Sequence, residues 1–83
     1  MDAGTENVSQ EARQRAALRQ FLSALSMAKN NLGAVYFAIG NYDSAQVHLT
    51  HALEIAPNFA SAHLTLGLLH HANGDQVTAL KEF

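Results

Sequence analysis

The five histidines are the side chains with the clearest capacity for chemistry. His48 and His51 are three residues apart and His63 and His70 are seven apart, so each pair would lie near one face of a helix. A protein zinc site needs three or four ligands, and the chain has no cysteine to complete such a set. We therefore interpret the histidines as exposed helix residues and expect no metal site and no cofactor.

The other candidates for catalysis are scattered. The sequence contains no Gly-x-Ser-x-Gly motif, no phosphate-binding glycine loop and no cysteine nucleophile. The carboxylates are Asp43, Glu54, Asp75 and Glu82, and they fall mostly at the ends of expected helices. Their interaction with the helix dipole explains their presence there. We expect the protein not to be an enzyme.

The composition favours a folded chain with a weak overall electrostatic field. Hydrophobic residues make up 48% and charged residues 14% of the 83 residues, which is unlike a disordered protein. The formal charge of -2 does not predict binding to nucleic acid or to a membrane. Arg13, Arg15 and Arg19 cluster, but Glu6 and Glu11 lie beside them, so we interpret this segment as a solvated helix face.

The expected location is cytoplasmic. A chain of this size without cysteines lacks the disulfides that usually stabilise small secreted domains. The first residues do not have the pattern of a signal peptide, and no apolar run approaches the roughly 20 residues that span a bilayer.

Apolar spacing indicates helices that could position these side chains. Residues 1–8 are polar and small and are expected to form a flexible tail. A helical stripe follows, with Leu18, Leu25, Leu32 and Ile39 spaced by seven. Residues 9–39 form either one helix or two that meet near residues 23–26, and the serines there favour the break slightly because serine is a common cap.

Glycine and proline divide the rest of the chain. Gly40 is suited to ending a helix and Asn41 to capping the next one, which continues to the stop at Pro57. Asn58 offers a cap for a third helix, and Gly74 with Asp75 repeats the glycine-then-cap pattern before a fourth helix from residue 76. No run of alternating β-branched residues predicts a strand.

The chain also repeats itself at an interval of 34 residues. The shift superposes Ala28 on Ala62, Leu32 on Leu66, Gly33 on Gly67, Ala38 on Ala72, Gly40 on Gly74 and Ala45 on Ala79. The first copy reads Asn31-Leu32-Gly33-Ala34-Val35-Tyr36, Gly40-Asn41-Tyr42, Ala45, Leu49, Ala52-Leu53 and Pro57-Asn58. This pattern resembles the tetratricopeptide repeat.

The resemblance implies an all-α fold of antiparallel helix-turn-helix repeats, a fragment of an α-solenoid, with an N-terminal helix. The expected division is a leading or capping helix at 9–25, a first repeat at 26–59 and an incomplete second repeat at 60–83. Gly33 and Ala45 would allow the paired helices to cross closely, with large side chains around the crossing at Leu32, Tyr36, Leu49 and Leu53.

The resemblance further implies a protein-protein interaction module or scaffold that binds a peptide or partner helix in a groove. The expected partner-binding residues are Met27, Asn30, Ala34, Phe37, Ser61, Leu64, Leu68 and His71. The alternative interpretation for these residues is packing against neighbouring helices. A second functional hypothesis is a homo-oligomeric structural module that assembles through the Leu18–Ile39 stripe and an exposed C-terminal face at Val77, Leu80 and Phe83.

Overall fold

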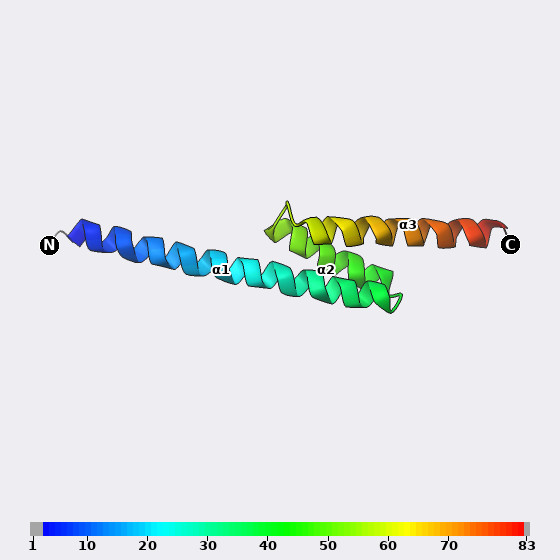
Figure 1. The fold of residues 1–83 in the computed structure, drawn as a ribbon, viewed down its shortest axis with the longest axis horizontal. Coiled ribbons are helices and arrows are strands. Elements are labelled where there is room, and N and C mark those ends of the chain that lie inside the picture. Colours follow the sequence, from blue (N-terminus) through cyan, green and yellow to red (C-terminus); the bar gives the residue numbers. More distant parts are fainter. Residues whose placement is uncertain (1–2, 83) are drawn as a thin grey trace.

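Three helices and two short connections make up the described chain. The computed structural model describes the backbone of residues 3–82 and the side chains of residues 8–74. The helices are α1 (Ala3–Ala38), α2 (Tyr42–Ile55) and α3 (Ala60–Glu82), and no strand occurs in the described range. They run alternately up and down, with the two ends of the chain at opposite ends of an elongated body (Figure 1). The prediction of an all-α, antiparallel helical fold is confirmed.

The body is thin and open. Its principal extents are 77 × 18 × 14 Å and its radius of gyration is 19.2 Å, whereas a compact domain of this length would have a radius of about 12 Å. The elongation arises because the first half of α1 and the second half of α3 extend beyond the short helix α2 in opposite directions (Figure 1). None of the described helices is long and apolar enough to cross a bilayer.

The turn between α1 and α2 forms as the sequence predicts. Gly40 has a φ of 84°, the left-handed conformation that glycine adopts without a side-chain penalty. The amide of Asn41 then donates to the carbonyl of Tyr36 at 2.9 Å. The side chain of Asn41 accepts a hydrogen bond from the amide of Ser44 at 3.3 Å, so it caps α2 as expected.

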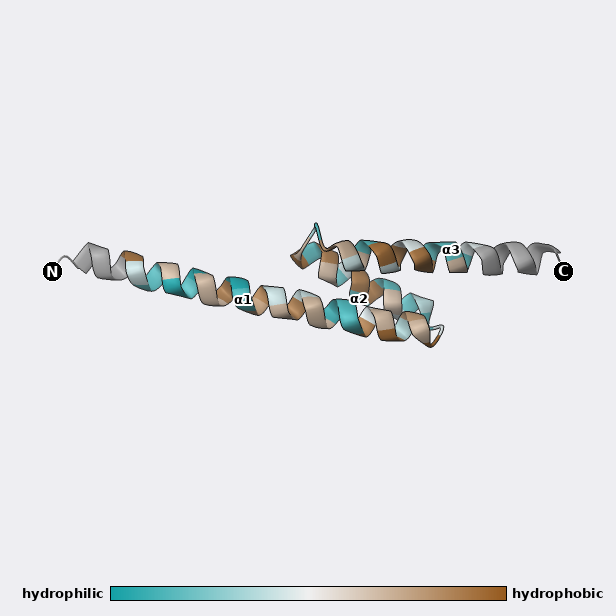
Figure 2. Cartoon of the chain, viewed as in Figure 1, coloured by the Kyte–Doolittle hydropathy of each residue, from teal (hydrophilic) through white to brown (hydrophobic). Residues whose placement is uncertain are grey.

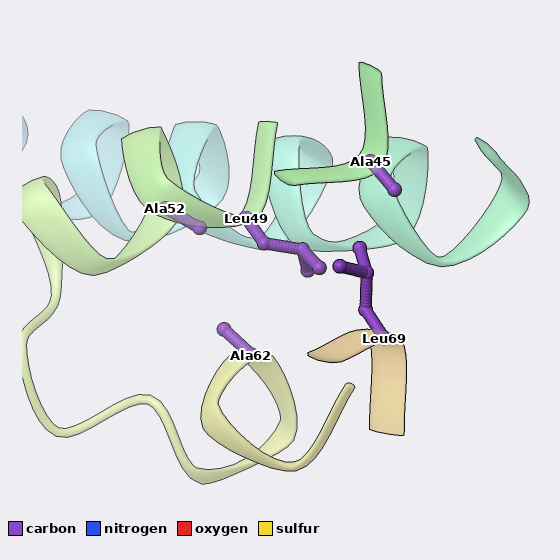
Figure 3. Packing of buried hydrophobic residues seen from close by; sticks show 5 residues of the cluster. All are labelled: Ala45, Leu49, Ala52, Ala62 and Leu69. Atoms are coloured by element: carbon purple, nitrogen blue, oxygen red, sulfur yellow. The ribbon is translucent and has the colours of Figure 1, made fainter. Parts of the chain in front are cut away.

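The core lies where α2 is enclosed by its two neighbours. The buried hydrophobic residues among the described side chains come from α2 and α3: Ala45, Leu49, Ala52, Ala62 and Leu69. Leu49 and Leu69 point toward one another across the α2–α3 interface (Figure 3). Gly33 of α1 is buried against the other side of Leu49, and this close crossing confirms the predicted role of Gly33.

One expectation about the first helix is wrong, and of the two alternatives for residues 9–39 the structure has the single helix. The helix begins at Ala3, not at Ser9, and it runs without a break through residues 23–26. No proline occurs before residue 57 to interrupt it. The hydroxyl of Ser26 donates to the carbonyl of Ser23 at 2.8 Å, a bond within the helix rather than a cap at its start.

The turn expected at Gly74 does not form either, because α3 continues through this residue to Glu82. Gly74 lacks the positive φ of Gly40, and a Cβ atom built on it would meet nothing within 4 Å. Among the residues whose side chains are described, none therefore packs on Gly74 to direct the chain to reverse there. The predicted face at Val77, Leu80 and Phe83 lies outside the described side chains.

One predicted core residue is also exposed. Leu32 was expected beside the helix crossing, yet 41% of its surface is accessible. It follows Asn31 and precedes Gly33 on a helix that turns about 100° per residue, and the Gly33 side faces α2. Tyr36 and Leu53, by contrast, pack against the core.

Candidate functional site

A hydrogen bond joins α1 to α3 between two of the residues expected to bind a partner. The side-chain amide of Asn30 donates to the hydroxyl of Ser61 at 3.3 Å. Asn30 is only 7% exposed, and its Oδ1 atom has no hydrogen-bond partner among the described residues. The structure thus brings these two residues together, although they are 31 positions apart in the chain.

Exposed apolar side chains flank this bond on both helices. Met27 and Ala34 are three residues before and four after Asn30, and Leu64 and Leu68 are three and seven after Ser61. Residues at these intervals share one side of a helix. Met27, Leu64 and Leu68 are 53%, 65% and 49% exposed. We call this surface, from Met27 to Ala34 on α1 and from Ser61 to His71 on α3, the α1–α3 surface.

The two remaining expected residues differ in their surroundings. Phe37 is half-buried, packs against the core and has its ring centroid 5.7 Å from that of Tyr42. Its main contacts are therefore with the chain itself. His71 is exposed and lies ten residues after Ser61, on the side of α3 that carries Leu64 and Leu68.

A concave site was missed by the sequence interpretation. A groove of about 560 Å³ lies where α1 passes the turn between α2 and α3. Its lining is largely apolar with one cation: Arg19, Leu22, Ser23, Ser26, Met27, Ile55, Ala56, Pro57, Asn58 and Phe59. We call it the turn groove, and it exists because α1 continues past residues 23–26, where a break was expected. Met27 belongs to both the turn groove and the α1–α3 surface.

The histidines mostly contact aromatic rings or the backbone. His48 stacks on Tyr36 with ring centroids 5.4 Å apart and planes 5° from parallel, and His51 meets His48 edge-on at 6.3 Å. His63 Nε2 is 2.7 Å from the carbonyl of Pro57, which ties α3 to the preceding turn. Within the described side chains, no three His, Asp or Glu residues are grouped closely enough to hold a metal ion.

The described chain has the features that define a helical-repeat protein. Two antiparallel helices are paired, a glycine lies at their close crossing, and a flanking helix repeats the same residue spacing. A protein-family model described as "TPR repeat" matches residues 33–74, half of the chain. The chain therefore belongs to the tetratricopeptide repeat family, as its sequence predicted. Searches of curated proteins and of solved structures returned no match. Repeats of this family generally mediate protein-protein interactions and are typically not catalytic.

Proposed function

We propose that this protein is an interaction module that binds a peptide or a partner helix on the α1–α3 surface. The observation that carries the proposal is the exposure of Met27, Leu64 and Leu68 around the Asn30–Ser61 hydrogen bond. Large apolar side chains that remain accessible on one side of two neighbouring helices favour contact with another protein.

The character of this surface favours an apolar partner. None of the eight residues expected to bind carries a carboxylate, an ammonium or a guanidinium group. An amphipathic helix that places leucine or phenylalanine side chains between α1 and α3 suits this surface, because such helices are recognised through apolar anchors at regular spacing. Without charges to screen, the affinity should depend little on salt.

The turn groove supports the same proposal. It continues from Met27 along α1 toward Arg19, so a bound segment longer than the α1–α3 surface would meet further apolar lining there. The proposed function requires no catalytic group, metal or cofactor, and no nucleic acid or membrane. We propose a cytoplasmic scaffold role, consistent with the lack of cysteine and the small net charge.

A displayed library of random peptides tests this proposal, because it offers the chain many candidate partner sequences at once. Selection on the intact chain should enrich peptides that carry apolar residues at helical spacing. Leu64→Asp and Leu68→Asp should each weaken binding of the enriched peptides about tenfold or more, since each places a charge in an apolar contact. Val47→Asp is the matched control, because Val47 is 51% exposed but lies on α2. Binding that survives both leucine changes, or that is lost with Val47→Asp, would contradict the proposal.

A homo-oligomeric role is the second candidate function. It is favoured by the exposure of the Leu18–Ile39 stripe, which is separate from the surface proposed for partner binding.

A further inference from the structure

The second uncovered surface runs along α1. Because α1 is one continuous helix, apolar residues at alternating intervals of three and four form a single row over its length. We call this row the α1 seam; its members are Leu18, Phe21, Leu25, Ala28, Leu32, Val35 and Ile39. Apolar residues recur on α1 even where no other helix lies beside it (Figure 2).

The seam is exposed to solvent in the single chain. Phe21 is 62%, Val35 57% and Ile39 69% exposed, while Leu18 and Leu32 are 56% and 41% exposed. Five residues of α1 face the other helices: Ser26, Asn30, Gly33, Tyr36 and Phe37. At 3.6 residues per turn, the mean direction of the seam lies roughly 125° around α1 from the mean direction of these five. Neither α2 nor α3 therefore covers most of the seam, although Leu25 is half-buried.

The open shape of the chain leaves surface that a second chain could cover. The accessible surface of the chain is 6073 Å², whereas a compact protein of 8.9 kDa exposes about 4,800 Å². The excess of about 1,300 Å² is spread over the whole elongated chain, and a standard stable interface buries roughly 800 Å² on each partner. The α1 seam is the part of this surface that carries Leu18, Phe21, Leu32, Val35 and Ile39 in one row.

We infer, on the basis of the homo-oligomeric candidate function, that a second copy of this chain covers the α1 seam, and that the two α1 helices pair antiparallel about a two-fold axis near residues 26 and 27. In this register Leu25 faces Ala28 of the partner subunit, Leu32 faces the partner's Phe21, and Leu18 faces the partner's Val35. Each such pair of facing residues forms one layer of the interface and joins residues of different size. The two-fold axis generates a second, identical copy of every layer.

The sizes of the seam residues select this orientation. A parallel pair in register would place each residue opposite itself, so Phe21 would crowd Phe21 of the partner subunit. Ala28 would then leave a gap against its own copy. Antiparallel pairing sets the small Ala28 against a leucine and Phe21 against Leu32, which keeps the layer volumes more even. On one flank of the seam, Ala17, Ala24 and Ala38 are small and uncharged and permit close approach, whereas the other flank carries Leu22, Lys29 and Tyr36.

The copy-on-copy interface does not use the surface proposed for partner binding. Leu64 and Leu68 lie on α3, and Asn30 lies on the side of α1 that faces Ser61. Each subunit of the dimer therefore keeps its own α1–α3 surface.

Sedimentation equilibrium of the intact chain tests the association. At tens of micromolar the chain should have the mass of two copies. Val35→Glu should raise the dissociation constant at least about tenfold, because the charge would be buried between two helices. Val47→Glu, the same change at a residue of similar exposure on α2, should leave the mass unchanged. A monomeric parent chain, or a dimer that Val35→Glu does not weaken, would overturn the inference.

Disulfide cross-linking tests the orientation, and the chain has no native cysteine to interfere. A mixture of the Leu18→Cys and Val35→Cys variants should cross-link under mild oxidation, whereas neither variant alone should do so efficiently. Circular dichroism of each variant establishes that its helices are retained. Rapid cross-linking of Leu18→Cys alone would indicate parallel pairing and would overturn the antiparallel arrangement.

Discussion

The buried surface of Gly33 lies directly against the side chain of Leu49. A Cβ atom at Gly33 would come within 2.6 Å of Leu49 Cγ and 2.8 Å of its Cδ2, and within 3.3 Å of the carbonyl oxygen of Ala45. Leu49 has no accessible surface, so it cannot move aside into solvent. The approach of α1 to α2 therefore depends on the lack of a side chain at this one residue.

Gly33→Ala should destabilise the fold. Overpacking costs about 1–3 kcal/mol, and the better helix propensity of alanine returns only about 1 kcal/mol. We expect a net loss of up to about 2 kcal/mol in the free energy of unfolding, measured by urea titration at a fixed chain concentration. Gly67→Ala is the control, because Gly67 is the counterpart of Gly33 in the 34-residue repeat and a Cβ there meets nothing within 4 Å. It should stabilise α3 by up to ~1 kcal/mol. Equal effects of the two changes would contradict the close crossing of α1 and α2.

The same comparison at Gly40 and Gly74 should give opposite signs. Gly40→Ala forces alanine into a left-handed conformation with φ near 84° and should cost roughly 1 kcal/mol or more. Gly74 lies inside α3 and its Cβ position is open, so Gly74→Ala should stabilise the helix by up to ~1 kcal/mol. Thermal unfolding followed by circular dichroism measures both. Destabilisation by Gly74→Ala would show that the chain turns there after all.

Leu49→Ala should be strongly destabilising. The side chain is fully buried, lies against Gly33 and points toward Leu69 (Figure 3). Loss of a buried leucine side chain costs about 2–5 kcal/mol, which is a large part of the stability of so small a domain. The far-ultraviolet circular dichroism signal near room temperature should fall markedly. Leu64→Ala removes the same atoms from a residue that is 65% exposed, and it should change stability by less than about 0.5 kcal/mol.

The Asn30–Ser61 bond should appear as a coupling free energy. Ser61→Ala leaves the buried amide of Asn30 without its acceptor, at a cost of about 1–3 kcal/mol. Asn30→Ala removes both groups of the amide, so adding Ser61→Ala to it should cost much less than Ser61→Ala alone. A double-mutant cycle in urea measures this difference. Strict additivity of the two single changes would show that the bond does not form in solution.

The sequence predicted the parts of the fold that depend on local chemistry. Gly40 and Asn41 specify a reversal that needs only a left-handed glycine and a capping amide. The 34-residue repeat predicted the family as well as the close crossing at Gly33. These features follow from residue type and spacing alone.

The errors have a common physical cause, since a residue that permits a turn does not require one. Ser23 and Ser26 can cap a helix, yet the Ser26 hydroxyl is satisfied within α1. Gly74 is followed by a residue able to cap a helix, as Gly40 is, but no packed side chain meets it. The turn groove could not be predicted for this reason, because it exists only if α1 continues past residue 26.

Gly67 on α3 is the counterpart, in the 34-residue repeat, of Gly33 on α1. Leu49 of α2 packs against Gly33, whereas no side chain packs against Gly67 among the described residues. A further helix that packed along α3 at Gly67 would contact the backbone of α3 directly. It could therefore approach α3 as closely as α2 approaches α1 at Gly33. An aliphatic side chain from that helix could pack on this backbone, because a Cβ atom at Gly67 would meet nothing within 4 Å among the described residues. Gly67 thus marks a place where another helix with an aliphatic side chain at its point of contact could be added to the array of helices.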